Sequence, residues 1–396
     1  MLTPQIPRVL KYLLLGLLAS YFALLIIQIW NSEKLQWDFY MYYHSAKAYA
    51  QGVNPYDTEA LSQIAQLPPG LNFVYPPITL PIMRVFLALD YRSASHLFLL
   101  MKCILALGLL FLWTRVFLKE QFDPLFALFC LIGFNGALCI DLISGNISLV
   151  EQFLIWSGFY FFLRRKLFLF CGLILLAALF KVTPLFFLVL LWFAEGRKKY
   201  AYFASSLLLY SIIMIATYLT APDLFMGFLH NSTSISEKRM HNPSTFSLIN
   251  EFTGLLGGIV KMSLPGPAAI IASIVAGTAV LLLSLWAFKA LERYSADKRD
   301  IFAIFLTCVV YALILPRFKE YSYVLLLLPA YFIILRIGKA NAFGPLFVFF
   351  ILSSIRSVNL PFIDPVFKIF WEHYPAILVF VTWGLYLYHI RWQLKQ

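Results

Sequence analysis

Apolar runs of about 20 residues recur along almost the whole chain, and each is long enough to cross the hydrocarbon core of a bilayer. Hydrophobic residues make up 61% of the 396 residues. Charged residues make up only 13%, against roughly 25% in a soluble protein. A soluble core of this size cannot bury so much apolar surface. The sequence therefore predicts an all-α polytopic membrane protein and excludes soluble enzymes, nucleic-acid-binding proteins and disulfide scaffolds.

The hydropathy pattern predicts about ten full spans. They cover residues 9–30, 95–117, 124–142, 147–163, 201–220, 267–290, 301–315, 321–336, 342–357 and 375–391. A shorter apolar pair, 167–180 and 183–194, fits a helical hairpin that turns at residues 181–184, with Pro184 in the first turn of the second helix. A single kinked span is the alternative. We expect one integral membrane domain over residues 1–396, whose first apolar stretch is a retained anchor.

The distribution of charge predicts the orientation. With the N-terminus in the cytoplasm, most of the 31 Lys and Arg residues fall in cytoplasmic loops, and that side carries the whole net charge of +12. Two large loops, 31–94 and 221–266, then face outward. Residues 75–90 are apolar but begin Tyr75-Pro76-Pro77, and a span there would invert all later loops, so we expect an interfacial helix. The cytoplasmic loops carry no Gly-rich phosphate-binding motif, so an activated substrate would have to be carried by the membrane.

The first outer loop holds the strongest candidate for catalysis. Asp38 stands between Trp37, Phe39 and Tyr40, soon after the first span. One interpretation is structural: Asp38 is the N-cap of a helix over 39–51, with Gly52 just past its end. The other is catalytic, because a carboxylate partly desolvated at the interface suits a general base. One residue can hold both roles.

Several motifs in this loop and beyond it resemble the glycosyltransferase 87 family. The first loop reads Asp38-Phe39, Tyr43, Ala46, Ala50, Gly52 and Asn54-Pro55-Tyr56-Asp57, followed by Tyr75-Pro76-Pro77. Later matches are Gly145-Asn146, Gly172 with Lys181-Val182-Thr183-Pro184, and Asn242-Pro243-Ser244. The similarity extends over about residues 9–335; the first loop is its specific part, and the later motifs are short.

The resemblance implies the type C glycosyltransferase fold and transfer of a sugar, most often mannose, from a polyprenyl phosphate on the outer face of the membrane. It also implies that Asp38 is the catalytic Asp. One departure stands out: the family often has a His-containing stretch after a Pro in a later outer loop, whereas residues 316–323 contain no His. That difference bears on how the donor phosphate is bound.

Cations that stabilise a departing lipid phosphate are a second requirement of this chemistry. Arg317 and Lys319 are candidates because they are the only basic residues in a very short outer loop, although snorkelling or pairing with Glu320 would explain them too. Lys181 lies in an apolar segment, which favours a functional role. It either reaches the donor phosphate or pairs with Asp141 or Glu151 for structural reasons.

The remaining candidates are polar and aromatic residues of the outer loops, which we assign to substrate binding. They are Trp37, Tyr40, Tyr43, His44, Tyr75, Asn146, His241, Asn242 and Tyr321. Interfacial aromatic residues and solvated loop histidines are the ordinary explanation for several of them. No metal-ligand spacing is found, so we expect a metal-independent reaction with no cofactor, in which the polyprenyl-phosphate sugar is a substrate.

The expected protein is thus an inverting hexosyltransferase of a bacterial inner membrane, with its site facing the periplasm. Its expected partners are membrane lipids, the lipid-linked donor and a glycolipid or glycan acceptor, with no nucleic acid, and a monomer suffices. Two alternatives stay open: a flippase or transporter of lipid-linked sugars, and a polysaccharide polymerase or ligase. The acceptor, the donor sugar and the prenyl chain length are not determined by the sequence.

Overall fold

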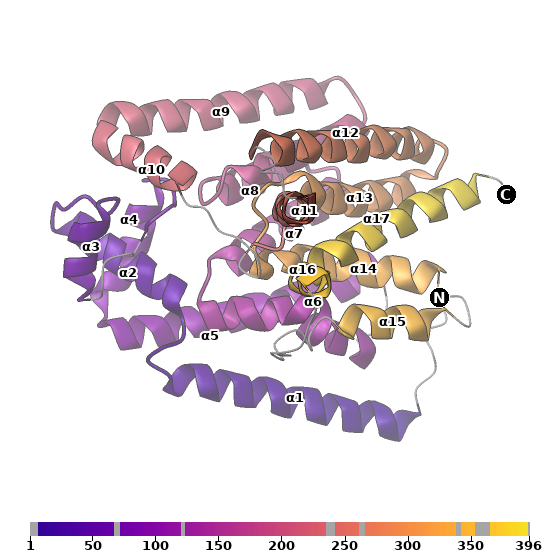
Figure 1. Cartoon of the computed structure of the whole chain (residues 1–396), viewed down its shortest axis with the longest axis horizontal. Helices are drawn as coiled ribbons and strands as arrows, with labels where there is room; N and C mark the ends of the chain where they lie inside the picture. The colour runs from indigo at the N-terminus through magenta and orange to yellow at the C-terminus, as the bar shows by residue number, and fades with distance from the viewer. Residues whose placement is uncertain are drawn as a thin grey trace. The chain divides into compact units, whose positions relative to one another are not determined.

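The computed structural model describes residues 7–66, 72–119, 123–234, 242–260, 266–337, 342–352 and 365–394, and every regular element in these ranges is a helix (Figure 1). The described chain divides into two compact units. Unit 1 comprises Met1–Phe22, Trp113–Ile140 and Glu237–Gln396, and unit 2 comprises Ala23–Leu112 and Asp141–Ser236. The all-helical prediction is confirmed over the described residues.

Unit 2 contains the first predicted outer loop and the central apolar helices. Its elements are α2 (Trp37–Ala50), α3 (Thr58–Ala65), α4 (Thr79–Met83), η1 (Arg84–Ala88), α5 (Tyr91–Leu112), α7 (Ser148–Leu163), α8 (Leu167–Ala178), η3 (Thr183–Phe193), α9 (Lys198–Thr220) and α10 (Pro222–Ser234). The short helix α2 packs against α3, α4, η1 and α5, while α7 packs against α5 and α8. This arrangement joins the first loop to the apolar helices within one unit.

Unit 1 contains the C-terminal helices. Its elements are η2 (Trp113–Leu118), α11 (Thr245–Val260), α12 (Gly266–Leu291), α13 (Ala296–Ile314), η5 (Glu320–Tyr323), α14 (Val324–Ile337), α15 (Phe343–Ile351), α16 (Pro365–Glu372) and α17 (Tyr374–Gln393). Helices α13, α14 and α17 lie side by side (Figure 1). Because α13 and α14 are buried on all sides over most of their length, they form the core of this unit.

Two helices cross the boundary between the units: α1 (Arg8–Asn31) and α6 (Pro124–Ser144). Within the described residues, six helices are long and apolar enough to span a membrane, and they match six of the ten predicted spans. These are Val9–Asn31, Tyr91–Leu118, Pro124–Ser144, Lys198–Thr220, Pro267–Leu291 and Glu320–Ile337. The other four predicted spans contain the helices α7, α13, α15 and α17, which do not meet the same criteria.

The surfaces of several long helices are apolar and uncovered by protein. Only 6% of the most apolar window of α9 is buried, and only 11% of that of α1. Large side chains such as Leu219 on α9 and Leu17 on α1 are 72% and 68% exposed. Helices that are hydrophobic all round require either a protein core or a membrane around them. The chain is therefore an integral membrane protein.

The span predicted over 124–142 is present as α6, but it is not a regular helix throughout. Residues 133–136 leave the helical conformation, and Phe134, Asn135 and Gly136 all have positive φ. A break of this kind exposes backbone polar groups, which lipid cannot satisfy. The break between two short helices in 167–194 is also present, with α8 ending at Ala178 and Pro184 in the first turn of η3.

Candidate active site

Asp38 lies in the first turn of α2, and the structure corrects its predicted capping role. The helix begins at Trp37 rather than at residue 39, so Gln36, with φ of 60°, is the N-cap and Asp38 is the second helical residue. The sequence prediction missed this because Gln36 is an unusual cap. At the other end the prediction is confirmed: the helix ends at Ala50, and Gly52 has φ of 77°.

The start of α2 is fixed against the turn that follows α6. The backbone N–H of Gln36 donates to the carbonyl of Ile143 at 2.7 Å. Gly145 has φ of 68°, and a Cβ there would stand 3.0 Å from the Cβ atoms of both Gln36 and Phe39. Only glycine permits both this conformation and this approach. Phe39 is fully buried and stacks on Phe98 at 4.5 Å between ring centroids.

The close packing of the start of α2 against the turn at Gly145 places Asp38 beside Asn146. The amide Nδ2 of Asn146 donates to Oδ2 of Asp38 at 2.7 Å and to the hydroxyl of Tyr75 at 3.2 Å. Tyr42 donates to the same Tyr75 hydroxyl at 2.8 Å and accepts the backbone N–H of Ile147 at 3.3 Å. Burial raises the pKa of Tyr75, so its hydroxyl stays protonated. The partly exposed Asp38 carboxylate therefore accepts a hydrogen bond from a buried neutral amide.

The motif Asn54-Pro55-Tyr56-Asp57 has a structural role in this arrangement. Asp57 is the N-cap of α3 and accepts the backbone N–H groups of Glu59 and Ala60. The Tyr56 hydroxyl donates to the backbone carbonyl of Tyr75 at 2.5 Å. The motif thereby fixes the segment that carries the Tyr75 hydroxyl.

A second chain of polar contacts continues behind Asn146. Its Oδ1 accepts both the backbone N–H and the hydroxyl of Ser148, at 2.9 Å and 2.8 Å. Lys181 donates from Nζ to the Ser148 hydroxyl at 2.7 Å and forms an ion pair with Glu151 at 3.0 Å. Of the two partners expected for Lys181 in a structural role, Glu151 is confirmed. Neither Ser148 nor Tyr42 was predicted from the sequence.

Asp141 has a different partner. Its Oδ1 lies 2.6 Å from Nζ of Lys102, and both side chains are fully buried. Lys102 also donates to the backbone carbonyl of Asp141. The electrostatic influence of Asp38 extends to both residues of this pair.

The predicted aromatic residues lie on the same helix as Asp38. Trp37 is 50% exposed, whereas Tyr40 and Tyr43 contact Tyr91. The His44 ring lies tilted against that of Tyr40, with 4.2 Å between the ring centroids. Burial, followed by the charge of Lys47, lowers the pKa of His44 to about 4. His44 is therefore neutral at physiological pH. Trp37 offers the most open aromatic surface near the carboxylate.

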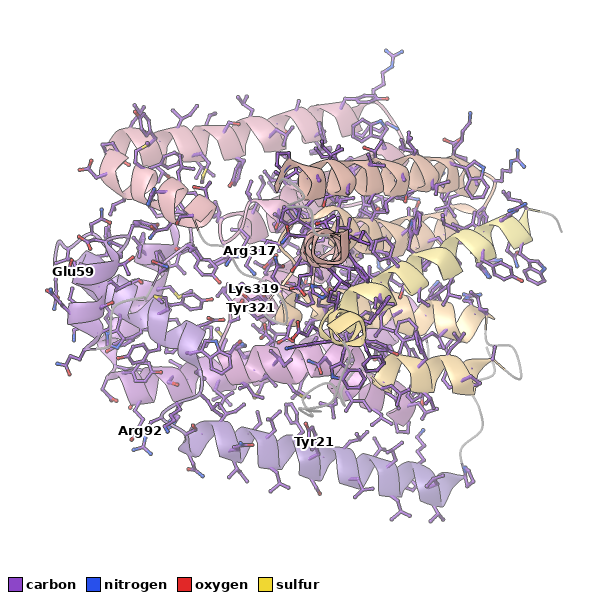
Figure 2. The ribbon with its side chains drawn as sticks, in the orientation of Figure 1. Tyr21, Glu59, Arg92, Arg317, Lys319 and Tyr321 are labelled. Atoms are coloured by element: carbon purple, nitrogen blue, oxygen red, sulfur yellow. The ribbon has the colours of Figure 1, made fainter. Side chains whose placement is uncertain are left out.

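The predicted cations Arg317 and Lys319 lie in unit 1, together with Tyr321 (Figure 2). Nζ of Lys319 stands 5.7 Å from the centre of the Tyr321 ring. In the same unit, the non-helical segment of α6 reaches this loop, because Nδ2 of Asn135 lies 3.4 Å from Oε1 of Glu320.

Asn242 holds the loop of these cations in place. Its Oδ1 accepts the backbone N–H of Phe318 at 2.8 Å, and its Nδ2 donates to the carbonyl of Pro316 at 3.3 Å. The Ser244 hydroxyl donates to the same carbonyl at 2.7 Å. Asn242 was predicted to bind substrate; its side chain contacts the backbone on both sides of Arg317, and the substrate contact stays a prediction. His241 lies outside the described residues.

Among the described residues, no group of three His, Cys, Asp or Glu side chains is placed to hold a metal ion. The candidate residues described above form two groups. In unit 2 the partly exposed Asp38 carboxylate is hydrogen-bonded to Asn146, and Lys181 is paired with Glu151. In unit 1 one loop carries Arg317 and Lys319.

Comparison with known proteins identifies the family. The sequence profile of glycosyltransferase family 87 matches residues 73–316, which is more than half of the chain. This range includes Tyr75, Asn146, Lys181 and Asn242, and it begins after Asp38. No curated protein and no solved structure matches the chain. The chain belongs to glycosyltransferase family 87.

Proposed function

We propose that the protein transfers a hexose, most often mannose in such enzymes, from a polyprenyl-phosphate donor to a hydroxyl of a lipid or glycan acceptor. Asp38 is the general base that takes the proton of that hydroxyl. The observation that carries the proposal is the 2.7 Å hydrogen bond between Asn146 and Asp38, which holds a partly exposed carboxylate at one end of a buried polar network. General bases of this kind act from a fixed position within reach of the proton.

The donor phosphate is bound by Arg317 and Lys319 in this proposal. Two cations on one short loop stabilise the charge that develops on a departing phosphate. Asn242 supports the proposal because it fixes the backbone on both sides of Arg317. With one base and a good leaving group, the reaction is a direct displacement that inverts the anomeric carbon.

The proposed bundle is of the type C glycosyltransferase kind, with the ten predicted spans and with α2, α3, α4 and η1 at the outer surface. The positive net charge of the predicted cytoplasmic loops supports this orientation. The enzyme then acts on the periplasmic face of a bacterial inner membrane, as a monomer. Trp37, Tyr40, Tyr43 and Tyr321 are the proposed aromatic contacts to sugar and lipid.

The proposed function is tested by measuring sugar transfer from several lipid-linked donors. Purified protein in detergent is given radiolabelled polyprenyl-phosphate mannose, the corresponding glucose donor, or a polyprenyl-diphosphate sugar, each with a membrane-lipid extract as acceptor. We expect label to move from a monophosphate donor to the acceptor fraction. Transfer only from the diphosphate donor favours a polymerase or ligase. Movement of intact donor across liposomes, without transfer, favours a flippase.

Replacing the two cations tests the donor site. We expect Arg317→Gln and Lys319→Gln each to raise the KM for the donor roughly tenfold or more, since a hydrogen bond to a charged group contributes about 1.5–3 kcal/mol. Initial rates at varied donor concentration measure the effect. Arg92→Gln is the matched control, because it removes the charge of an exposed arginine that has no part in the proposed donor site (labelled in Figure 2). An unchanged KM in both loop variants contradicts this donor site.

Metal removal gives a further prediction. We expect transfer to continue at an unchanged rate after prolonged incubation with EDTA, because Arg and Lys stabilise the leaving phosphate in the proposed mechanism. The measurement is the initial rate with EDTA, and with Mg²⁺ or Mn²⁺ added back. A rate that falls with EDTA and recovers with one of the ions contradicts the proposal.

A further inference from the structure

The side chain of Asn146 is held in one orientation by its hydrogen bonds. Asn146 is only 1% exposed. Its Oδ1 accepts the backbone N–H of Ser148 at 2.9 Å. A backbone N–H can only donate, so the amide oxygen must face Ser148. The NH₂ group then faces Asp38 and Tyr75, and both of these contacts are within hydrogen-bond distance.

The hydroxyl of Ser148 is also fixed in direction. Lys181 has only donors on its ammonium group, so the Ser148 oxygen accepts from Nζ at 2.7 Å. The Ser148 proton is then directed to Oδ1 of Asn146, at 2.8 Å. Glu151 holds the ammonium group from its other side at 3.0 Å, and its side chain is 5% exposed. The hydrogen bonds therefore all have the same direction: Lys181 donates to Ser148, Ser148 to Asn146, and Asn146 to Asp38.

We propose that Asn146, Ser148 and Lys181 are positioning residues that keep the Asp38 carboxylate ionised and aimed at the acceptor hydroxyl. This inference rests on the proposed role of Asp38 as the general base. From the sequence, Asn146 was expected to bind substrate, and Lys181 either to bind the donor phosphate or to pair with Asp141 or Glu151. The geometry assigns both to Asp38, since Asn146 is buried behind it and the charge of Lys181 is paired with Glu151.

This series of hydrogen bonds acts on Asp38 through the Asn146 amide, which donates to the ionised carboxylate and so favours ionisation of Asp38. Titratable groups that face this region include the tyrosines Tyr42 and Tyr75 and the charged residues Lys102, Asp141, Lys181 and Glu151. Tyr75 is held protonated by burial, and the two ion pairs Lys102–Asp141 and Lys181–Glu151 balance their own charges. A substitution at Asn146 that replaces the donating NH₂ group is therefore the most direct way to remove this stabilisation of the Asp38 carboxylate.

The test measures the protonation of Asp38 itself. Protein labelled with ¹³C in its Asp carboxyl groups is titrated by infrared spectroscopy, and the Asp38 band is assigned by its loss in Asp38→Asn. Three variants are compared with the wild type: Asn146→Asp, Ser148→Ala and Ser148→Thr. Ser62→Ala is the control, since Ser62 is a buried serine of α3 whose hydroxyl donates to the carbonyl of Thr58. Elution volume and thermal midpoint confirm that each variant folds.

In Asn146→Asp two carboxylates share one site, so we expect the pKa of Asp38 to rise by about one unit or more. In Ser148→Ala one of the two bonds to Oδ1 of Asn146 is lost, and kcat falls about five- to tenfold with little change in KM. In both variants we expect the acidic limb of the pH–rate profile to move to higher pH. Ser148→Thr keeps the hydroxyl and behaves like the wild type.

Identical Asp38 titrations in Asn146→Asp, Ser148→Ala and the wild type overturn the inference. So does a Ser148→Thr variant that shifts as far as Ser148→Ala, because its hydroxyl is retained. The infrared titration needs no substrate. If the titration shifts as expected but no donor supports transfer by the wild type, the proposed function fails and the positioning of Asp38 stands.

Discussion

Asp38→Asn is expected to lower kcat for sugar transfer by about 10²–10⁴-fold, the usual contribution of a general base. The substitution removes the proton acceptor and keeps the shape of the side chain. Because Gln36, and not Asp38, caps α2, the helix should persist. The amide oxygen of the new side chain still accepts from Asn146, so the KM for the donor should change little. Initial rates over a range of donor concentrations provide both constants.

The matched control for this variant is Glu59→Gln. Glu59 is an exposed carboxylate in the same predicted outer loop, on α3, and its substitution should leave kcat within about twofold because Glu59 has no part in the proposed reaction. Figure 2 labels its position. Equal rates for Asp38→Asn and Glu59→Gln would mean that Asp38 is not the base.

Lys102→Met is expected to cause the largest loss of stability. It leaves the carboxylate of Asp141 buried and without its ion-pair partner, and breaking one side of a buried pair costs about 3–5 kcal/mol. The double variant Lys102→Met/Asp141→Val removes both charges and should recover most of the loss. The measurement is the thermal midpoint of the purified protein in detergent.

The control is the pair of Lys368 and Glu372, in which the lysine is exposed. Their charged atoms are 4.0 Å apart and Lys368 is 56% exposed, so Lys368→Met should shift the midpoint little. A midpoint of Lys102→Met as high as that of Lys368→Met would show that the buried pair does not stabilise the fold. So would a double variant that is less stable than Lys102→Met alone.

The sequence predicted the class of fold because hydropathy acts over long segments. Six of the ten predicted spans meet the length and composition criteria for crossing a membrane, and the other four contain helices. The break in α6 was missed, since the apolar run over 124–142 continues through it and only Gly133, Asn135 and Gly136 hint at it. The end of α2 was predicted from Gly52, whereas its start was not, because Gln36 resembles no usual cap.

The sequence also singled out residues that the fold then places together. Asp38, Tyr75, Asn146 and Lys181 are far apart in the sequence, and direct or relayed hydrogen bonds join them in unit 2. Ser148 was overlooked because a serine near the start of an apolar helix carries no signal of its own. Asn242 was selected for substrate binding, whereas its contacts to the backbone around Arg317 are visible only in the folded loop.

The most direct test of the central claim is the stoichiometry of a single reaction. Purified wild-type protein is incubated with a polyprenyl-phosphate sugar and a lipid acceptor, and the free polyprenyl phosphate and the glycosylated acceptor are both quantified. We expect equal amounts of the two products from the wild type and neither product from Asp38→Asn. Two results would contradict the proposed transferase activity. In one, the folded wild-type protein moves the donor across liposomes and the donor is recovered intact. In the other, Asp38→Asn forms the same amounts of both products as the wild type.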